Sequence, residues 1–146
     1  MTPLDGERLQ QIRANSAFAI EEFREAAEKD IGLDVDSVAW VEGFVERARD
    51  QYGAGEVPNG LVSVIGSYLG EAIIAETGGH WAEDTNGGLG IAFPNGDAVF
   101  AFAKVQKQFD EGVAAGESIL SFYTVSVSYI AIGALRPASE TADEPS

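Results

Sequence analysis

Residues Asn59–Thr77 have the sequence NGLVSVIGSYLGEAIIAET, which is a strongly apolar helical pattern. Its apolar side chains cover most of the circumference of a helix, and a helix that is apolar nearly all round is buried. Gly66 and Gly70 lie four residues apart on this helix. Because glycine has no side chain, the pair forms a smooth patch that another helix or strand can approach closely. We therefore expect a central, buried helix that the other elements surround.

A thin polar line follows the same helix, because Ser63, Ser67 and Glu71 recur at every fourth residue. A carboxylate on a mostly buried helix must find a hydrogen-bond partner or lose its charge. We expect Glu71 to accept hydrogen bonds from a lysine, an arginine or backbone amides, and so to hold the strands against the helix. The alternative is that Glu71 acts as a general acid or base in a pocket.

Two amphipathic helices are predicted before this stretch. The first covers Glu7–Lys29, and Gly32 is expected to supply its left-handed stop. The second begins after three candidate N-caps in Asp34–Ser37 and ends at Gly53. Apolar residues recur along it at helical spacing, and its polar residues are assigned to the opposite, solvent-facing side. Those polar residues are Glu42, Glu46, Arg47, Arg49 and Asp50.

After the central helix the hydrophobic period changes to two, which is typical of strands. Three short strands are predicted, at residues 80–83, 89–93 and 98–102. Glycine-rich and Pro-Asn-Gly turns join them, so the sequence predicts an antiparallel meander of three strands. Residues 1–6 are expected to be a frayed start.

The C-terminal part is predicted to be helical again. A helix over residues 104–112 is expected to bury Val105 and Phe109, and to turn Lys104, Lys107 and Gln108 outward. Ser118 is a candidate cap for a last segment through residue 132, which we expect to be a helix that turns irregular. Residues 136–146 are rich in Pro, Ser, Thr and acid, and are expected to form a disordered acidic tail. The fold class predicted is α+β, with helices packed on the meander in a single compact domain of residues 1–135.

The net charge of the chain argues against some classes of function. The chain of 146 residues carries 24 acidic and 9 basic side chains, a net charge of -15, and no segment supplies a basic face. Nucleic-acid binding depends on phosphate neutralisation by Lys and Arg, and anionic membranes also attract basic segments, so we expect neither. The electrostatic complement of this chain is a basic protein. With no cysteine, no signal peptide and no apolar run that spans a bilayer, the expected location is cytoplasmic.

No catalytic or metal-binding pattern emerges, so we predict no catalytic residue, no cofactor and no metal. His80 is the single histidine and lacks the spacing of a zinc site. The serines lack the Gly-x-Ser-x-Gly elbow of a nucleophile. Lys104 and Lys107 share a helical face, where they meet an anionic ligand, pair with Glu71 or are simply solvated. The candidate polar cluster, for binding or for structure, is Glu71, Trp81, Lys104 and Lys107.

Several motifs in order carry a resemblance to a known family. Gly66–Glu71 is a Gly-x-x-Leu-Gly-Glu helix, Gly78–Trp81 is a Gly-Gly-x-Trp step, and Phe102–Lys107 is a Phe-x-Lys-Val-x-Lys segment. Together with Glu117–Ile119 and the pair Phe122-Tyr123, they make residues 36–124 resemble an uncharacterised bacterial domain family. That family tends to have proline where Ala101 stands and aspartate where Glu117 stands. The resemblance implies a bacterial α+β domain and transfers no catalytic residue.

The function predicted is that of a non-enzymatic, acidic protein-binding module. One form of this hypothesis is an immunity-like or inhibitor role, in which the acidic protein masks a basic face of its partner. The alternative is a small-molecule binder or enzyme with a pocket centred on Glu71, and a third possibility is a structural subunit of a homo-oligomer. The sequence leaves the oligomeric state open.

Overall fold

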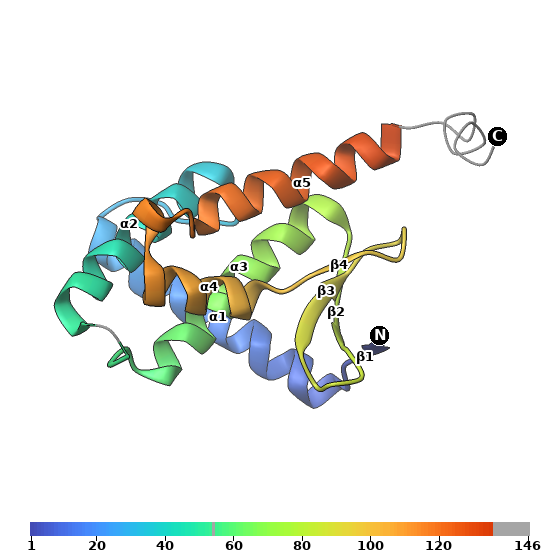
Figure 1. Ribbon diagram of the computed structural model, residues 1–146, viewed down its shortest axis with the longest axis horizontal. Helices are drawn as coiled ribbons and strands as arrows, with labels where there is room; N and C mark the ends of the chain where they lie inside the picture. The colour runs from blue at the N-terminus through green and yellow to red at the C-terminus, as the bar shows by residue number, and fades with distance from the viewer. Residues whose placement is uncertain (54, 136–146) are drawn as a thin grey trace.

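The computed structural model describes residues 1–53 and 55–135, with side chains described as far as residue 130 (Figure 1). The predicted acidic tail, residues 136–146, lies outside the described residues. The α+β class is confirmed. The elements are β1 Thr2–Pro3, α1 Gly6–Ala27, α2 Val35–Tyr52, α3 Asn59–Thr77, β2 His80–Glu83, β3 Leu89–Ala92, β4 Ala98–Val99, α4 Ala101–Glu111, the short 3-10 helix η1 Val113–Ala115 and α5 Ile119–Leu135.

Helix α3 is the central element, as its sequence predicts. Ile65, Tyr68 and Leu69 are fully buried, because α1, α4 and α5 all pack against this helix (Figure 1). The Tyr68 hydroxyl donates a hydrogen bond to the carbonyl oxygen of Gly32 at 2.7 Å, which ties α3 to the loop between α1 and α2. Among the described residues, no helix is both long and apolar enough to cross a membrane.

The glycine patch of α3 receives two aromatic rings. A Cβ atom placed on Gly66 would lie 2.3 Å from Phe102 Cδ1, and one on Gly70 would lie 2.1 Å from Trp81 Cη2. The two rings also touch each other, with centroids 5.4 Å apart. The predicted close approach is therefore confirmed, and the partners are side chains from β2 and α4. Any side chain at Gly66 or Gly70 would displace them.

The sheet has four antiparallel strands in the order β1-β2-β3-β4, so the prediction of three was wrong. The missed strand is β1, because Thr2 pairs with Glu83 and Pro3 with Ala82. Residues 1–6 are thus not a frayed start, and Leu4 is buried. A two-residue strand that contains proline carries no period in sequence, and proline is accepted here because β1 is an edge strand.

Two element boundaries differ from the prediction, the end of the last strand and the end of the first helix. The strand expected at residues 98–102 ends at Val99, and α4 begins at Ala101, whose side chain is buried. The first helix ends at Ala27, where Glu28 adopts the left-handed conformation (φ 54°) that was assigned to Gly32. Of the three candidate caps of the second helix, Asp34 is the one used, because its Oδ1 accepts a hydrogen bond from the Ser37 amide at 2.8 Å.

A buried amide joins α4 to α2 and α5. Gln108, predicted to face outward, is 0% exposed. Its Nε2 donates to Glu46 Oε2 at 2.8 Å, and its Oε1 accepts from the Ile119 amide at 2.9 Å. The prediction was wrong because Gln108 finds partners for both ends of its amide, which offsets the cost of burying it.

Glu42 and Glu46 also point inward, although the sequence assigned them to the solvent face of α2. Glu42 Oε2 accepts hydrogen bonds from the Ser118 hydroxyl and from the Leu120 amide, and Glu46 Oε2 accepts one from the Val113 amide. Glu42 thus satisfies a free amide in the first turn of α5, where a helix favours negative charge, and Glu46 satisfies the first amide of η1. Ser118 is confirmed as the cap, since its Oγ accepts from the Ser121 amide.

Helix α5 is continuous through Leu135, so the expected irregularity is absent from the described chain. The alternation of Val125, Val127 and Tyr129 with serines, which suggested a strand, falls on a helix that packs across α2 and α3. One of its sides stays open, where Val125 is 63% exposed.

Replacing Gly70 by alanine tests the glycine patch. Alanine adds helix propensity of up to about 1 kcal/mol, but the new methyl group overlaps the Trp81 ring, and overpacking of this kind costs about 1–3 kcal/mol. We expect Gly70→Ala to lower the free energy of unfolding in urea by about 2 kcal/mol. The control is Gly60→Ala on the same helix, where nothing lies within 4 Å; its stability should stay the same or rise. Equal stability of the two variants would contradict the close approach.

A leucine at position 108 tests the buried amide. Gln108→Leu keeps the side chain's bulk but leaves the Ile119 amide and Glu46 without this partner, and each unsatisfied group costs about 1–3 kcal/mol. The free energy of unfolding should fall by about 2–4 kcal/mol. The matched control is Gln106→Leu, two residues away and exposed, which should change it by less than about 0.5 kcal/mol. Similar values for the two variants would show that the network contributes nothing.

Candidate functional site

Glu71 and Trp81 form one contact between α3 and β2. Trp81 is 2% exposed, and its Nε1 donates a hydrogen bond to Glu71 Oε2 at 2.8 Å. The partner of Glu71 is therefore an indole and not the lysine, arginine or backbone amide that the sequence suggested. The carboxylate does hold a strand against the helix, as expected. The hydrogen bond from Trp81 also fixes the position of the Trp81 ring, which covers Gly70.

Lys104 and Lys107 lie apart from this pair. Lys104 Nζ is 2.7 Å from Glu117 Oε1, and both side chains are partly buried. The pKa of Glu117 is lowered, first by its hydrogen bond from Lys104 and further by the charges of Lys104 and Lys107. Lys104 thus pairs with Glu117 and not with Glu71. The predicted cluster of four residues divides into Glu71 with Trp81 and Lys104 with Lys107.

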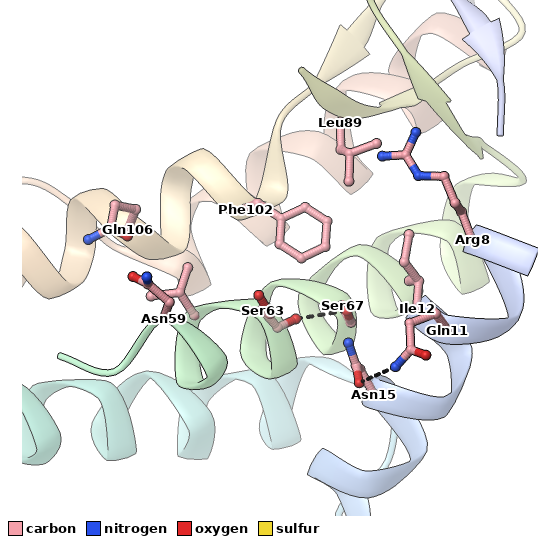
Figure 2. Close-up of a pocket in the computed structure, with 11 residues that line it drawn as sticks. Arg8, Gln11, Ile12, Asn15, Asn59, Ser63, Ser67, Leu89, Phe102 and Gln106 are labelled. Carbon is pink, nitrogen blue, oxygen red and sulfur yellow. Dashed lines mark hydrogen bonds between the residues drawn. The ribbon is translucent and has the colours of Figure 1, made fainter. Parts of the chain in front are cut away.

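The cleft in Figure 2 has a volume of about 460 Å³ and lies between α1, α3, α4 and β3. Figure 2 shows Asn59 and Gln106 at one end, Arg8 and Leu89 at the other, and the Phe102 ring between them. Ser63 and Ser67, the start of the polar line on α3, face this cleft, and the Ser67 hydroxyl donates to the Ser63 carbonyl at 2.8 Å. The polar line therefore leads to a cleft that Glu71 does not line.

The chemistry of this cleft is that of hydrogen bonding. Its polar groups are amides and hydroxyls together with the Arg8 guanidinium, whose Nη1 is 3.1 Å from Glu83 Oε2. Gln11 Nε2 donates to Asn15 Oδ1 at 3.2 Å along one wall. Apolar walls with a few polar groups are typical of small-molecule sites. Sequence reasoning missed the cleft because four separate elements supply its lining, and only the serine spacing pointed towards it.

In the described part of the chain, no three His, Asp or Glu side chains are grouped so that they could hold a metal ion. His80 is an exposed residue of β2, opposite Ala92 of β3. The cleft in Figure 2 offers groups that can bind a ligand. Among the described residues, no serine is hydrogen-bonded to His80.

Comparisons with models of protein families, with curated proteins and with solved structures find no match to this chain. The resemblance to a bacterial domain family therefore stays a prediction. The site has to be interpreted from its own geometry.

The Glu71–Trp81 contact predicts a difference between two substitutions. Glu71→Gln keeps an acceptor for the indole N–H, so stability should change by less than about 1 kcal/mol. Glu71→Leu leaves that buried N–H unpaired and should lower the free energy of unfolding by about 1–3 kcal/mol. Urea denaturation followed by circular dichroism measures both. The control is Glu76→Leu, an exposed position on the same helix. A structural role for Glu71 is ruled out if Glu71→Leu matches that control.

Proposed function

We propose that this protein is a non-enzymatic binding module whose partner is a basic protein. The observation that carries the proposal is the excess of exposed carboxylates that no basic side chain neutralises. Four exposed carboxylates lie along the C-terminal half of α1 and at its C-cap. They are Glu21, Glu22, Glu25 and Glu28.

Ion pairs neutralise little of this charge. Within the described residues the ion pairs are Arg8 with Glu83, Arg24 with Asp30, and Lys104 with Glu117. The net charge of -15 therefore acts outward, as a field that attracts a basic surface and repels nucleic acid. A partner of opposite charge gains association rate and specificity from such a field.

A particular form of this function is an immunity-like or inhibitor role. An acidic protein that covers the basic face of a toxin or nuclease must associate faster than that protein reaches its target. Electrostatic steering supplies such rates, about 10–1,000-fold above those of neutral partners. Many exposed carboxylates suit this role, because each adds a small attraction to the basic partner before the two proteins touch.

A second candidate function is the binding of a small polar molecule. The observation that favours it is the cleft of about 460 Å³ in Figure 2, which combines an aromatic wall with amides, hydroxyls and one guanidinium. In this candidate function the small-molecule site is not centred on Glu71. Glu71 does not line the cleft and is hydrogen-bonded to Trp81 instead. A small molecule retained by the protein isolated from its own cells, and detected by native mass spectrometry, would favour this candidate.

The first experiment is capture of partners by the tagged protein from a lysate of its own cells, at low and at high salt, with identification by mass spectrometry. A stoichiometric basic protein that salt releases supports the proposal. Acidic or neutral partners that resist salt contradict it.

The association rate with the captured partner tests the electrostatic mechanism. Because exposed charges are screened beyond about 10 Å at 0.1 M salt, we expect the rate constant to fall at least about tenfold between about 0.01 and 0.15 M ionic strength. The dissociation rate should change much less, since steering acts on encounter. Stopped-flow fluorescence measures both. A rate constant that does not depend on salt would remove the electrostatic version of the proposal.

A further inference from the structure

A second cleft, of about 340 Å³, lies where the start of α2, the end of α3 and the middle of α5 meet. Figure 1 shows the C-terminal end of α3 beneath α5. Asp34 and Glu76 supply two carboxylates to the lining, and Val35 and Val127 supply apolar walls. Among the residues that the structure describes, no lysine, arginine or histidine lines this cleft.

The Tyr123 hydroxyl has no hydrogen-bond partner among the described residues, although Tyr123 is only 5% exposed and lines the same cleft. Every fully enclosed polar side-chain atom of the described chain does have a partner. The Tyr123 hydroxyl is therefore the part of this buried side chain that reaches open space. A buried tyrosine usually finds a partner for its hydroxyl, so this one is free for a ligand.

Negative charge converges on that hydroxyl. Burial raises the pKa of Tyr123, and the charges of Glu76 and Asp34 raise that pKa further, so both carboxylates act on the phenol. Both carboxylates are exposed, and neither belongs to an ion pair in the described residues. Asp34 uses Oδ1 to cap α2, and its other carboxylate oxygen is left for a ligand.

The end of α3 adds to this negative charge. The last turns of α1 and α2 carry Arg24 and Arg49, but the last turn of α3 carries no basic residue. The C-terminus of a helix favours a cation. A positive group in the cleft would therefore meet two carboxylates, a hydroxyl oxygen and the negative end of α3.

We infer that the cleft between Asp34 and Glu76 receives a lysine or arginine side chain of the basic partner, an inference that rests on the proposed function. Such a side chain is amphipathic, with an apolar stem and a cationic head. Val35 and Val127 match the stem, whereas the carboxylates and the Tyr123 hydroxyl match the head. The cleft volume lies at the lower end of the range for ligand sites, which fits one side chain.

Titration with a lysine homopeptide tests this site without the partner. Amide chemical shifts of the isotopically labelled full chain are followed by NMR at about 0.15 M salt, where exposed charges are strongly screened. We expect the largest shifts at Val35, Thr124 and Val127. The test variant is Asp34→Asn with Glu76→Gln, because asparagine caps a helix as well as aspartate does.

The control is Glu22→Gln with Glu25→Gln, which removes two charges from the exposed face of α1. Loss of the two cleft carboxylates should weaken peptide binding about tenfold, and the control should weaken it less than about threefold. Tyr123→Phe should weaken it about threefold without loss of stability, because the hydroxyl makes no hydrogen bond within the described residues. Equal weakening by the two double variants, or shifts that follow α1, would overturn the inference.

Two further outcomes also decide the matter. The free polyamine spermidine carries the same ammonium group, and if it shifts the same amides as strongly as the peptide does, the cleft serves free amines and not a protein side chain. Absence of any peptide binding overturns the inference as well. The proposed function is tested separately by partner capture: a salt-released basic partner that binds the Asp34→Asn, Glu76→Gln variant normally leaves the function standing and removes only this site.

Discussion

The fold depends on the contact between the glycine face of α3 and two aromatic rings. Trp81 covers Gly70, Phe102 covers Gly66, and the rings touch each other. Their burial removes large apolar areas from water, and each ring brings its own element onto the helix. The hydrogen bond from Trp81 to Glu71 gives the indole N–H a partner, without which its burial would be costly. The sheet and α4 are thus both held on one side of α3.

This arrangement also sets where the two clefts described above form. The Phe102 ring that rests on Gly66 is a wall of the cleft in Figure 2. The other end of α3 meets α5, whose start is held by Glu42 and Gln108, and the cleft with Asp34 and Glu76 lies there. One buried helix therefore contributes to both sites. The cleft in Figure 2, lined by amides, hydroxyls and the Arg8 guanidinium, suits hydrogen bonding, whereas the cleft with Asp34 and Glu76 suits a cation.

Sequence reasoning succeeded where a local pattern has a local physical cause. The buried helix, its glycine patch, the Asp34 cap and the hairpin of β2 and β3 all follow from periodicity, backbone freedom and capping. It failed where a polar residue is buried with partners that are distant in sequence. Gln108 and the α2 glutamates look solvent-facing by residue type, yet Gln108 bonds Glu46, 62 residues away, and Glu42 accepts from the Leu120 amide, 78 residues away. Strand β1 was missed for the same reason, since its two residues form a strand only through β2.

By itself, the sequence determined the excess of negative charge, the absence of cysteine, the helices and the antiparallel hairpin. Composition fixes the first two, and short-range hydrogen bonding and hydrophobic period fix the others. Only the tertiary structure shows that Glu71 pairs with Trp81, that Lys104 pairs with Glu117, and that Tyr123 lines one cleft with two carboxylates. The reason is physical: a polar side chain takes its role from the groups that packing brings within a few ångströms of it, and most of those groups come from other elements of the chain.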